Sequence, residues 1–465
     1  MIPILKESVR IRQEPDGIIF RNMEEGTYIF VSFLEGFILS FFDGTRTIED
    51  AANILKNLKN APEEREIKRD INKLIKKREE FIEMIERPIK KGKVLTNPYD
   101  FLLNPDICKQ PIRPHAPLSA LIYVTRRCNL NCVYCFADAQ YSSQRGSNHC
   151  DEMSLDQIKC IIDQIAELEI KNIVFTGGEA TLRPDLPEII RYSIYHDLEV
   201  SLPTNACLID DNLAQELKNL GIKEIQAKLD AANPKTQDKL SGVKGSYKKL
   251  TRGIETLKKH SFKVCVVAVA TSWNIEEIPE VVRICADLGV DTVIPRIYTP
   301  GIWALRGRGG AYLNPSPNSI LWLDKKIEEL QKDYDGMEVL FRDYPAFQEK
   351  KESDVASCPG FTSDCTIMEN GLVVPCETLA DFSSEFIMGD AKKERLIDIW
   401  NTEKAKRWAL RESPKVGGPC LTCDEFWRCK GGCPWKSIVA YGTWSGDPSC
   451  VRTPSPTEIP FAVVP

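Results

Sequence analysis

The chain has 465 residues, of which 43% are hydrophobic and 28% are charged, and its formal net charge is −6. This composition is typical of a globular protein of about two to four domains, and the negative charge excludes a global basic field for nucleic acid or anionic lipid. No apolar run is long enough to span a membrane, and the first residues lack the pattern of a signal peptide, so we expect a cytoplasmic chain without a membrane or nucleic-acid partner.

Residues 1–85 are predicted to form a small N-terminal domain. β-like stretches separated by turn signals lie at 7–12, 17–22 and 26–32, and helical patterns follow at 33–42, 47–59 and 62–83. Three strands followed by three helices are typical of a winged helix-turn-helix domain. The next segment, 86–117, contains six prolines and little periodicity, so we expect it to be a linker.

The pattern then changes to alternating strands and helices. The strand candidates are 118–124, 171–177, 197–203, 224–230, 263–270 and 291–297, and the helices between them include 154–168, 184–195, 246–259 and 276–288. This alternation predicts an α/β fold with a parallel sheet and right-handed crossovers. Six units suit either a partial barrel or a doubly wound sheet, and in both folds the ligand site lies at the carboxyl ends of the strands.

Three cysteines directly follow the first predicted strand, at Cys128, Cys132 and Cys135, with the spacing C-x3-C-x2-C. Clustered cysteines in a reducing compartment favour metal binding over disulfides. A structural zinc site with Cys150 or His149 as fourth ligand is one interpretation, although zinc more often takes paired C-x2-C ligands. A Gly-Gly-Glu run, residues 177–179, stands at the end of the second strand. It is expected to lie close to the cysteines, at the carboxyl ends of the strands.

The cysteine spacing, with Tyr134 before the last cysteine, and the Gly-Gly-Glu run resemble the radical S-adenosylmethionine superfamily. The resemblance implies a partial (β/α)6 TIM barrel over 118–300 in which three thiolates hold a [4Fe–4S] cluster and leave one iron for S-adenosylmethionine. It also implies reductive cleavage of that cofactor to methionine and a 5′-deoxyadenosyl radical, which abstracts a hydrogen atom from an unactivated C–H bond.

The resemblance further implies contacts to S-adenosylmethionine. The candidates are Tyr134, Gly177, Gly178, Glu179, Thr204, Asn205 and Lys228. Backbone groups of the glycines should meet the methionine amino group with the glutamate nearby, Tyr134 should lie near the adenine, and the turn at 203–206 should contact the ribose. Ala180 departs from the proline that the family often has after the glutamate. Lys228 either pairs with the cofactor carboxylate or is an ordinary solvated lysine.

A second group of cysteines lies in the C-terminal region, at Cys358, Cys365, Cys376, Cys420, Cys423, Cys429, Cys433 and Cys450. Eight cysteines could ligate two four-cysteine clusters, and two zinc sites are the alternative. The pattern resembles the SPASM extension of radical S-adenosylmethionine enzymes, which implies a cysteine-rich, loop-rich Fe–S domain over 358–452, after a bridging region, 301–357, and before a tail, 453–465.

This second resemblance also implies how the eight cysteines divide between two auxiliary [4Fe–4S] clusters. The first cluster would be held by Cys358, Cys365, Cys376 and Cys433. The second would be held by Cys420, Cys423, Cys429 and Cys450.

The N-terminal segment resembles the precursor-peptide recognition element of ribosomal peptide maturases. The resemblance implies that an extended leader peptide pairs with the edge of the third strand, 26–32, and packs on the helix at 62–83. The alternative is a DNA-binding winged helix, which is disfavoured because 62–83 has no clear positive excess.

These resemblances together predict a radical peptide maturase that uses an electron donor such as flavodoxin or ferredoxin and forms sulfur-to-carbon thioether crosslinks. Carbon–carbon or carbon–oxygen crosslinking, epimerisation and backbone excision are alternatives. A different class of protein, a multi-cluster electron-transfer or scaffold protein, is also an alternative. It is disfavoured because an electron carrier has no use for a cluster iron that lacks a protein ligand. None of the four histidines follows a predicted strand, so the sequence identifies no catalytic residue.

Overall fold

The computed structural model of the chain describes residues 9–14, 17–22, 27–31, 114–136, 139–141, 152–299, 313–332, 334, 336–341, 358–409, 417–423, 431–441 and 444–447. The chain divides into two compact units, residues 1–115 with 350–356 and residues 116–349 with 357–465, and each is described by itself. The helices predicted at 33–42, 47–59 and 62–83, most of the predicted linker and the predicted tail lie outside the described residues.

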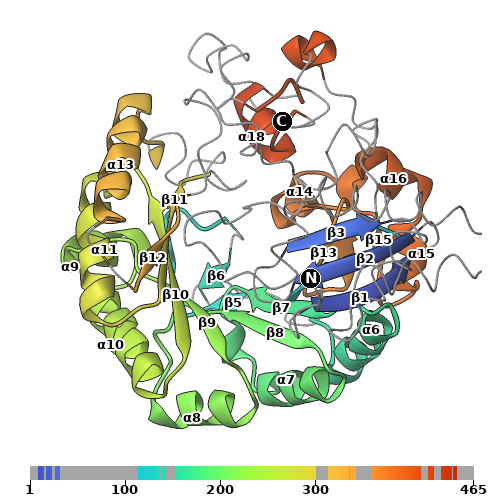
Figure 1. Cartoon of the computed structure of the whole chain (residues 1–465), viewed down its shortest axis with the longest axis horizontal. Helices are drawn as coiled ribbons and strands as arrows, with labels where there is room; N and C mark the ends of the chain where they lie inside the picture. Colours follow the sequence, from blue (N-terminus) through green and yellow to red (C-terminus); the bar gives the residue numbers. More distant parts are fainter. Residues whose placement is uncertain are drawn as a thin grey trace, which may run out of the picture. The chain divides into compact units, whose positions relative to one another are not determined.

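The first unit contains a three-stranded antiparallel sheet in the order β1-β2-β3 (Figure 1). Its strands are β1 (Val9–Glu14), β2 (Gly17–Asn22) and β3 (Thr27–Val31). The register pairs Phe20 of β2 with Ile11 on one side and Ile29 on the other. All three predicted strands are thereby confirmed, whereas the winged helix-turn-helix arrangement stays a prediction.

The second unit is built on a ten-stranded mixed sheet in the order β12-β11-β10-β9-β8-β7-β4-β13-β14-β15. Its central parallel strands are β4 (Ser119–Thr125), β7 (Asn172–Gly177), β8 (Glu199–Pro203), β9 (Glu224–Lys228), β10 (Lys263–Ala270) and β11 (Thr292–Ile297). These are the six predicted strands, and they follow one another in chain order without the reversal of a doubly wound sheet. The sequential order supports the partial (β/α)6 barrel, which remains a prediction.

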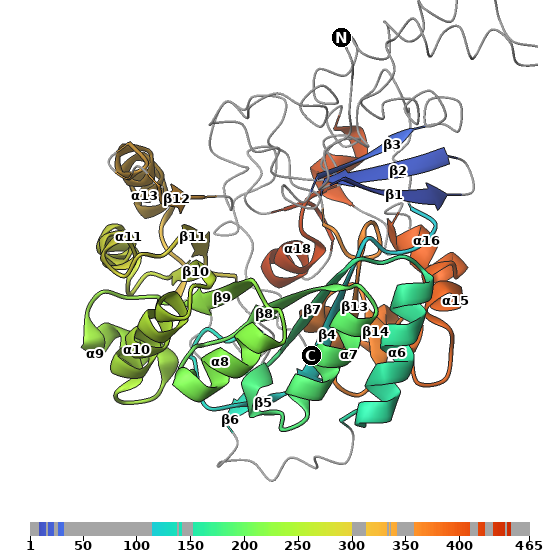
Figure 2. The same cartoon turned by 60° about the horizontal axis from the view of Figure 1, so that its bottom comes forward.

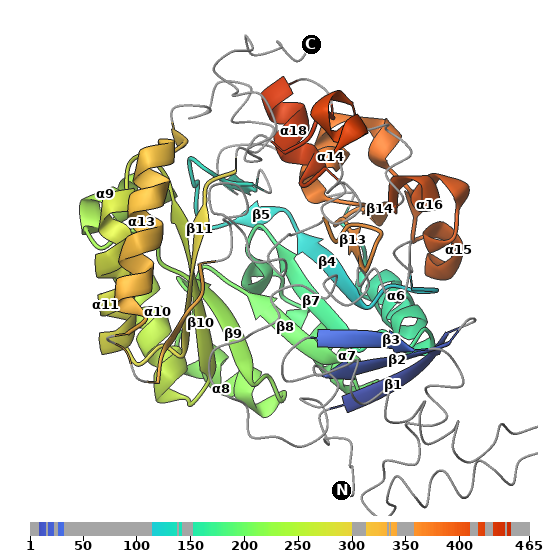
Figure 3. The same ribbon diagram turned by 45° about the horizontal axis from the view of Figure 1, so that its top comes forward.

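Helices follow these strands and lie along the outer side of the curved sheet (Figures 1 and 3). They are α6 (Leu155–Glu167), α7 (Leu186–Tyr195), α8 (Asp211–Asn219), α9 (Pro234–Ser241), α10 (Ser246–Lys259), α11 (Ile278–Asp287) and α13 (Pro317–Leu330). Two short 3-10 helices, η2 (Ala180–Leu182) and η3 (Ile275–Glu277), stand between them in the chain. Helix α6 begins with a capping box between Ser154 and Gln157 and buries Ile158, Ile161 and Ile165 at helical spacing.

The cysteine-rich region continues the same sheet, which the sequence analysis did not predict. Strand β13 (Asp364–Ile367) pairs in parallel with β4 and places Cys365 opposite Ala120. Strands β14 (Leu372–Val374) and β15 (Gly389–Asp390) extend the sheet beyond β13 with antiparallel pairing. Strand β12 (Glu338–Val339) pairs in parallel with β11 and is the strand at the other edge. Figure 2 shows β13 and β14 beside β4.

Short helices cover this end of the sheet around an aromatic core. They are α14 (Glu377–Phe382), η5 (Ser384–Phe386), α15 (Leu396–Trp400), α16 (Glu403–Ala409), η6 (Gly418–Thr422) and α18 (Pro434–Tyr441). Four tryptophans, Trp400, Trp408, Trp435 and Trp444, are buried there. Apolar burial of this size stabilises the region in addition to any metal it holds.

Among the helices of the described residues, none is long and apolar enough to cross a membrane.

Candidate functional site

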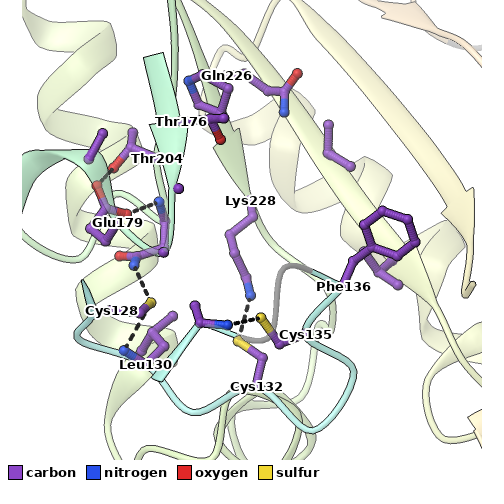
Figure 4. A pocket seen from close by; sticks show the side chains of 18 of the residues that line it. Cys128, Leu130, Cys132, Cys135, Phe136, Thr176, Glu179, Thr204, Gln226 and Lys228 are labelled. Atoms are coloured by element: carbon purple, nitrogen blue, oxygen red, sulfur yellow. Dashed lines mark hydrogen bonds between the residues drawn. The ribbon is translucent and has the colours of Figure 1, made fainter. Parts of the chain in front are cut away.

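A cavity of about 320 Å³ lies at the carboxyl ends of the central strands (Figure 4). Cys128, Cys132 and Cys135 line it, and so do all seven predicted cofactor contacts, Tyr134, Gly177, Gly178, Glu179, Thr204, Asn205 and Lys228. The structure therefore brings together residues that are separated by up to about a hundred positions in the chain. Their roles as ligands stay predictions, and the following geometry tests whether the residues fit them.

The cysteine loop is held by the carboxyl end of α9. The N–H groups of Asn131 and Val133 donate to the carbonyl oxygens of Ser241 and Leu240, both at 2.9 Å. The last carbonyls of a helix have no partner within the helix, so they are free to bind a neighbouring loop. These two hydrogen bonds fix the backbone on either side of Cys132.

The two glycines of the Gly-Gly-Glu run let β7 approach the same loop. A β-carbon on Gly178 would lie 2.2 Å from the carbonyl oxygen of Arg127, so no larger residue fits there. The N–H of Gly178 donates to Thr125 O at 2.9 Å, and the N–H of Glu179 donates to Arg127 O at 2.8 Å. These two hydrogen bonds fix the backbone of the Gly-Gly-Glu run against the cysteine loop.

Glu179 joins the loops that follow β7 and β8. Its side chain is 2% exposed, and its Oε1 atom accepts hydrogen bonds from the hydroxyls of Thr181 and Thr204, both at 2.7 Å. Its Oε2 atom accepts the backbone N–H of Asn205 at 2.7 Å. The carboxylate is thus occupied by the protein itself and positions the turn at 203–206.

Each of the three loop cysteines accepts a hydrogen bond at sulfur. The donors are Leu130 N to Cys128 at 3.4 Å, Lys228 Nζ to Cys132 at 3.1 Å and Ala139 N to Cys135 at 3.2 Å. Figure 4 shows these sulfurs and the lysine pointing into the same space. Donors of this kind stabilise the thiolate form, which is the form that binds metal.

The electrostatics of the three sulfurs also suit a cationic group. Burial raises the pKa of the Cys128 thiol to about 12, and the neighbouring Cys132 and Cys135 act in the same direction. Iron bound to the three sulfurs would remove this repulsion, because a coordinating thiol is deprotonated by the metal charge. The residues present therefore fit an iron–sulfur cluster.

Within the described part of the chain, no three histidine, cysteine or acidic side chains converge on a position for one metal ion. The three sulfurs line one cavity, and the choice between an iron–sulfur cluster and a zinc site stays a prediction. His149 and Cys150, the alternative fourth zinc ligands, lie outside the described residues.

Lys228 is not an ordinary solvated lysine. Its Nζ atom donates to Cys132 Sγ at 3.1 Å and to the Tyr134 hydroxyl at 2.6 Å, and it lies 3.4 Å from Asp230 Oδ2. The Tyr134 hydroxyl in turn donates to Asp230. Burial opposes the charged amine, but Asp230, Cys132 and Tyr134 together hold the pKa of Lys228 well above its usual value. Since the tyrosine hydroxyl is engaged, its ring is the part that an adenine would contact.

The structure brings together three of the four cysteines predicted for the first auxiliary cluster. Cys358 and Cys433 lie close enough to Cys376 for their charges to raise its pKa in addition to the larger effect of burial. The pKa of Cys433 is raised to about 12 by burial first and by Cys358 second. Cys365 is buried on β13, where burial first and Asp364 second raise the pKa of its thiol.

The second predicted auxiliary site is described only in part. Cys420 lies within η6 and Cys423 directly follows it, and both are half-buried. Cys429 and Cys450 lie outside the described residues.

Two residues without a predicted role connect the cavity to the second cysteine group. Glu377 lines the cavity, and the thiol of the preceding Cys376 lies 3.5 Å from its Oε2 atom. The buried Tyr123 of β4 also lines the cavity and shares a hydrogen bond with Glu377. The position of Glu377 directly after a predicted cluster ligand was the sequence signal that could have identified it.

Comparisons with known proteins agree with this geometry. Residues 122–285 match the model of the radical SAM superfamily, and residues 358–424 match that of the iron–sulfur cluster-binding SPASM domain. The chain is 27% identical to the AdoMet-dependent heme synthase of Methanosarcina barkeri, over 73% of this chain and 98% of the relative. It is 24% identical to the PqqA peptide cyclase of Bradyrhizobium diazoefficiens, over 73% of this chain and 87% of the relative.

Among solved structures, the fold is similar to that of Streptococcus suis SuiB bound to S-adenosylmethionine. The TM-score is 0.68 at 19% identity, and the likeness covers 99% of both chains. SuiB has also been crystallised with its precursor peptide SuiA.

Proposed function

We propose that this chain, a radical S-adenosylmethionine enzyme with a SPASM extension, matures a ribosomally made precursor peptide by abstracting a hydrogen atom from its core. The observation that carries the proposal is the convergence of Cys128, Cys132 and Cys135 with the glycines of β7 around one cavity. The peptide substrate is supported by the PqqA peptide cyclase among the relatives and by the crystallisation of SuiB with a precursor peptide.

The cofactors are S-adenosylmethionine and [4Fe–4S] clusters, which together supply a 5′-deoxyadenosyl radical when bound. In our proposal Cys128, Cys132 and Cys135 hold one cluster and leave one iron for S-adenosylmethionine. The carbonyl oxygens of Gly177 and Gly178 accept from its amino group, and the Tyr134 ring packs near its adenine.

The turn at 203–206 orients the cofactor ribose in this proposal. Glu179 fixes this turn through Thr204 and Asn205. The Thr204 hydroxyl already donates to Glu179 and accepts the N–H of Ala206 at 3.1 Å, so its contribution to cofactor binding is to shape the cavity. A turn that the protein itself already holds in place loses less conformational entropy when a ligand binds.

The SPASM region holds two auxiliary clusters in our proposal. The first is bound by Cys358, Cys365, Cys376 and Cys433, and the second by Cys420, Cys423, Cys429 and Cys450. Clusters held by these cysteines would supply an acceptor for the electron that is left when a substrate radical forms a new bond. That role suits a net two-electron oxidation, and among such reactions we propose a sulfur-to-carbon thioether crosslink. A flavodoxin or ferredoxin would supply the electrons that start each turnover.

The edge of β3 is the proposed docking site for the leader of the precursor. Among the described residues β3 pairs only with β2, so its other edge can accept an added strand. The likeness to SuiB extends over 99% of the chain and therefore includes this sheet.

A second candidate substrate is a tetrapyrrole, which the similarity to a heme synthase favours. That alignment covers 73% of the chain, so about a quarter of the chain has no counterpart in the heme synthase. The wider likeness to SuiB is the reason for preferring a peptide.

The proposed function is tested by offering both substrates to the anaerobically reconstituted protein with S-adenosylmethionine and dithionite. The peptide offered is a cysteine-containing precursor, to be sought among the short reading frames that neighbour the gene, and the tetrapyrrole is an iron coproporphyrin. Loss of two hydrogens from the peptide, with loss of a thiol that iodoacetamide alkylates, supports a thioether. Loss of two hydrogens with the thiol retained indicates another crosslink. Turnover of the porphyrin alone would contradict the proposal.

A further inference from the structure

Lys228 lies on the inner side of β9 with its ammonium group directed at the sulfur of Cys132 (Figure 4). An ammonium group has three N–H donors. Three acceptors surround Nζ, namely Cys132 Sγ at 3.1 Å, the Tyr134 hydroxyl at 2.6 Å and Asp230 Oδ2 at 3.4 Å. Two of the three donors of this lysine thus have hydrogen-bond partners in the protein, and Asp230 balances its charge.

Asp230 is itself held in place by several hydrogen bonds. Its side chain is fully buried, and its Oδ1 atom accepts the backbone N–H of Val269 on β10 at 3.0 Å. Its Oδ2 atom accepts the Tyr134 hydroxyl and lies 3.4 Å from Gln237 Nε2. A carboxylate anchored to a neighbouring strand and to α9 cannot move freely, so it holds the lysine in place.

A charged N–H group that donates to a ligand sulfur changes how easily the cluster bound by that sulfur is reduced. Reduction adds negative charge to an iron–sulfur cluster, and hydrogen bonds to its sulfurs and nearby positive charge stabilise the reduced form. Charge-assisted hydrogen bonds are the strongest of this kind.

We propose that Lys228, held by Asp230 and Tyr134, sets the reduction potential of the cluster bound by Cys128, Cys132 and Cys135. Asp230 is then a positioning residue that acts through the lysine. The inference rests on the proposed cluster site but is independent of the substrate. It assigns to Lys228 a role different from pairing with the cofactor carboxylate.

The test is the midpoint potential of this cluster in full-length, anaerobically reconstituted protein without S-adenosylmethionine. Its EPR signal is identified as the one that changes when the cofactor is added and that the Cys132→Ala variant lacks. We expect Lys228→Met to shift the potential to a more negative value, because the charge and the donor are both lost. Lys228→Gln keeps a neutral N–H donor and should give a smaller shift in the same direction.

Lys171→Met is the matched control. Lys171 also pairs with an aspartate, Asp197 at 3.0 Å, but that pair lies at the opposite, amino end of β7, so its loss should leave the potential unchanged. If Lys228→Met does not assemble the cluster, the shift in Lys228→Gln decides the result.

An unchanged potential in Lys228→Met overturns the inference. If that variant also loses affinity for S-adenosylmethionine, the lysine binds the cofactor carboxylate instead. The iron content of the unmodified protein separates this failure from failure of the cluster site itself, because a protein that takes up no four-iron cluster would overturn both.

Discussion

A β-carbon at Gly242 would lie 2.3 Å from the carbonyl oxygen of Asn131, so glycine at the end of α9 is what allows this helix to touch the cysteine loop. Gly242 is also the C-cap of α9 with a φ of +67°, a conformation that other residues adopt at a cost. The two residues are far apart in sequence, yet their contact holds Cys132 at the cavity.

We expect Gly242→Ala to reduce iron binding by the loop. The added methyl group must push the loop away, which breaks the hydrogen bonds from Asn131 and Val133 to α9 and displaces Cys132. The measurement is iron per chain after anaerobic reconstitution, together with the melting temperature.

Gly245→Ala is the matched control for this change. Gly245 has a φ of +80°, but no atom lies within 4 Å of the position that a β-carbon would take there. Both variants should lose about 1–2 kcal/mol from the left-handed conformation, and only Gly242→Ala should also lose iron. Equal iron content in the two variants would show that the contact with Asn131 does not position the cysteines.

The central strands could be predicted from sequence because each is either an apolar run, as in β10, or a stretch that alternates buried and exposed residues, as in β9. The strands of the structure lie within two residues of the predicted bounds at each end. Cys265 and Cys285, which sit in apolar patterns, are 7% and 0% exposed, as expected of core residues. In contrast, the addition of β13 beside β4 was not predicted, since sheet pairing between distant segments leaves no periodic signal in either one.

The residues of the site could be predicted, but their contacts with one another could not. Motif spacing identified Glu179, yet its hydrogen bonds to Thr204 and Asn205 depend on how two loops meet. The bond from Lys228 to Cys132 spans 96 positions in the chain. Such contacts arise from the packing of strands and loops, and a single sequence does not contain that information.

The metal content is the most direct prediction. Anaerobically reconstituted protein should bind about twelve irons per chain if it holds three four-iron clusters. Replacing Cys128, Cys132 and Cys135 together by alanine should remove about four of them. Iron and acid-labile sulfide assays give both numbers, and tight stoichiometric zinc with little iron would be incompatible with the cluster assignments.

Cleavage of S-adenosylmethionine should depend on Cys132. With dithionite the protein should form 5′-deoxyadenosine and methionine. Cys132→Ala should lose this activity by at least about a hundredfold, because it removes a ligand, and the loss of an outer-shell partner alone costs about 10–100-fold. Cys160→Ala is the control, because Cys160 is an exposed cysteine on α6 that should be dispensable. Full cleavage by Cys132→Ala, measured by liquid chromatography, would place the cofactor site elsewhere.

Glu179→Gln tests whether the glutamate positions the turn at 203–206. The amide keeps one acceptor oxygen for the threonine hydroxyls, but its NH2 group then faces the N–H of Asn205. Two opposed donors in a buried site should cost about 1–3 kcal/mol. We therefore expect a lower melting temperature and weaker binding of S-adenosylmethionine.

The control for this variant is Glu199→Gln, since Glu199 is exposed at the start of β8. It should change neither quantity. If Glu179→Gln bound the cofactor as tightly as the unmodified protein and melted at the same temperature, the hydrogen bonds of Glu179 would not be what orders the turn.

The edge of β3 provides the last prediction, which separates leader binding from chemistry. Neighbouring residues of a strand direct their N–H groups to opposite sides, so one of Tyr28 and Ile29 donates toward β2 and the other toward the opposite edge, which pairs with no strand among the described residues. Proline lacks the N–H group. The two variants are Tyr28→Pro and Ile29→Pro, and one of them removes the donor on the edge away from β2. This variant should keep the melting temperature of the N-terminal unit but lose affinity for the leader. The affinity is measured by fluorescence anisotropy with a labelled synthetic leader. The other should destabilise the sheet.

Cofactor cleavage should continue in both variants, because the cavity belongs to the second unit. Undiminished leader binding by both variants would show that the leader does not add to this edge.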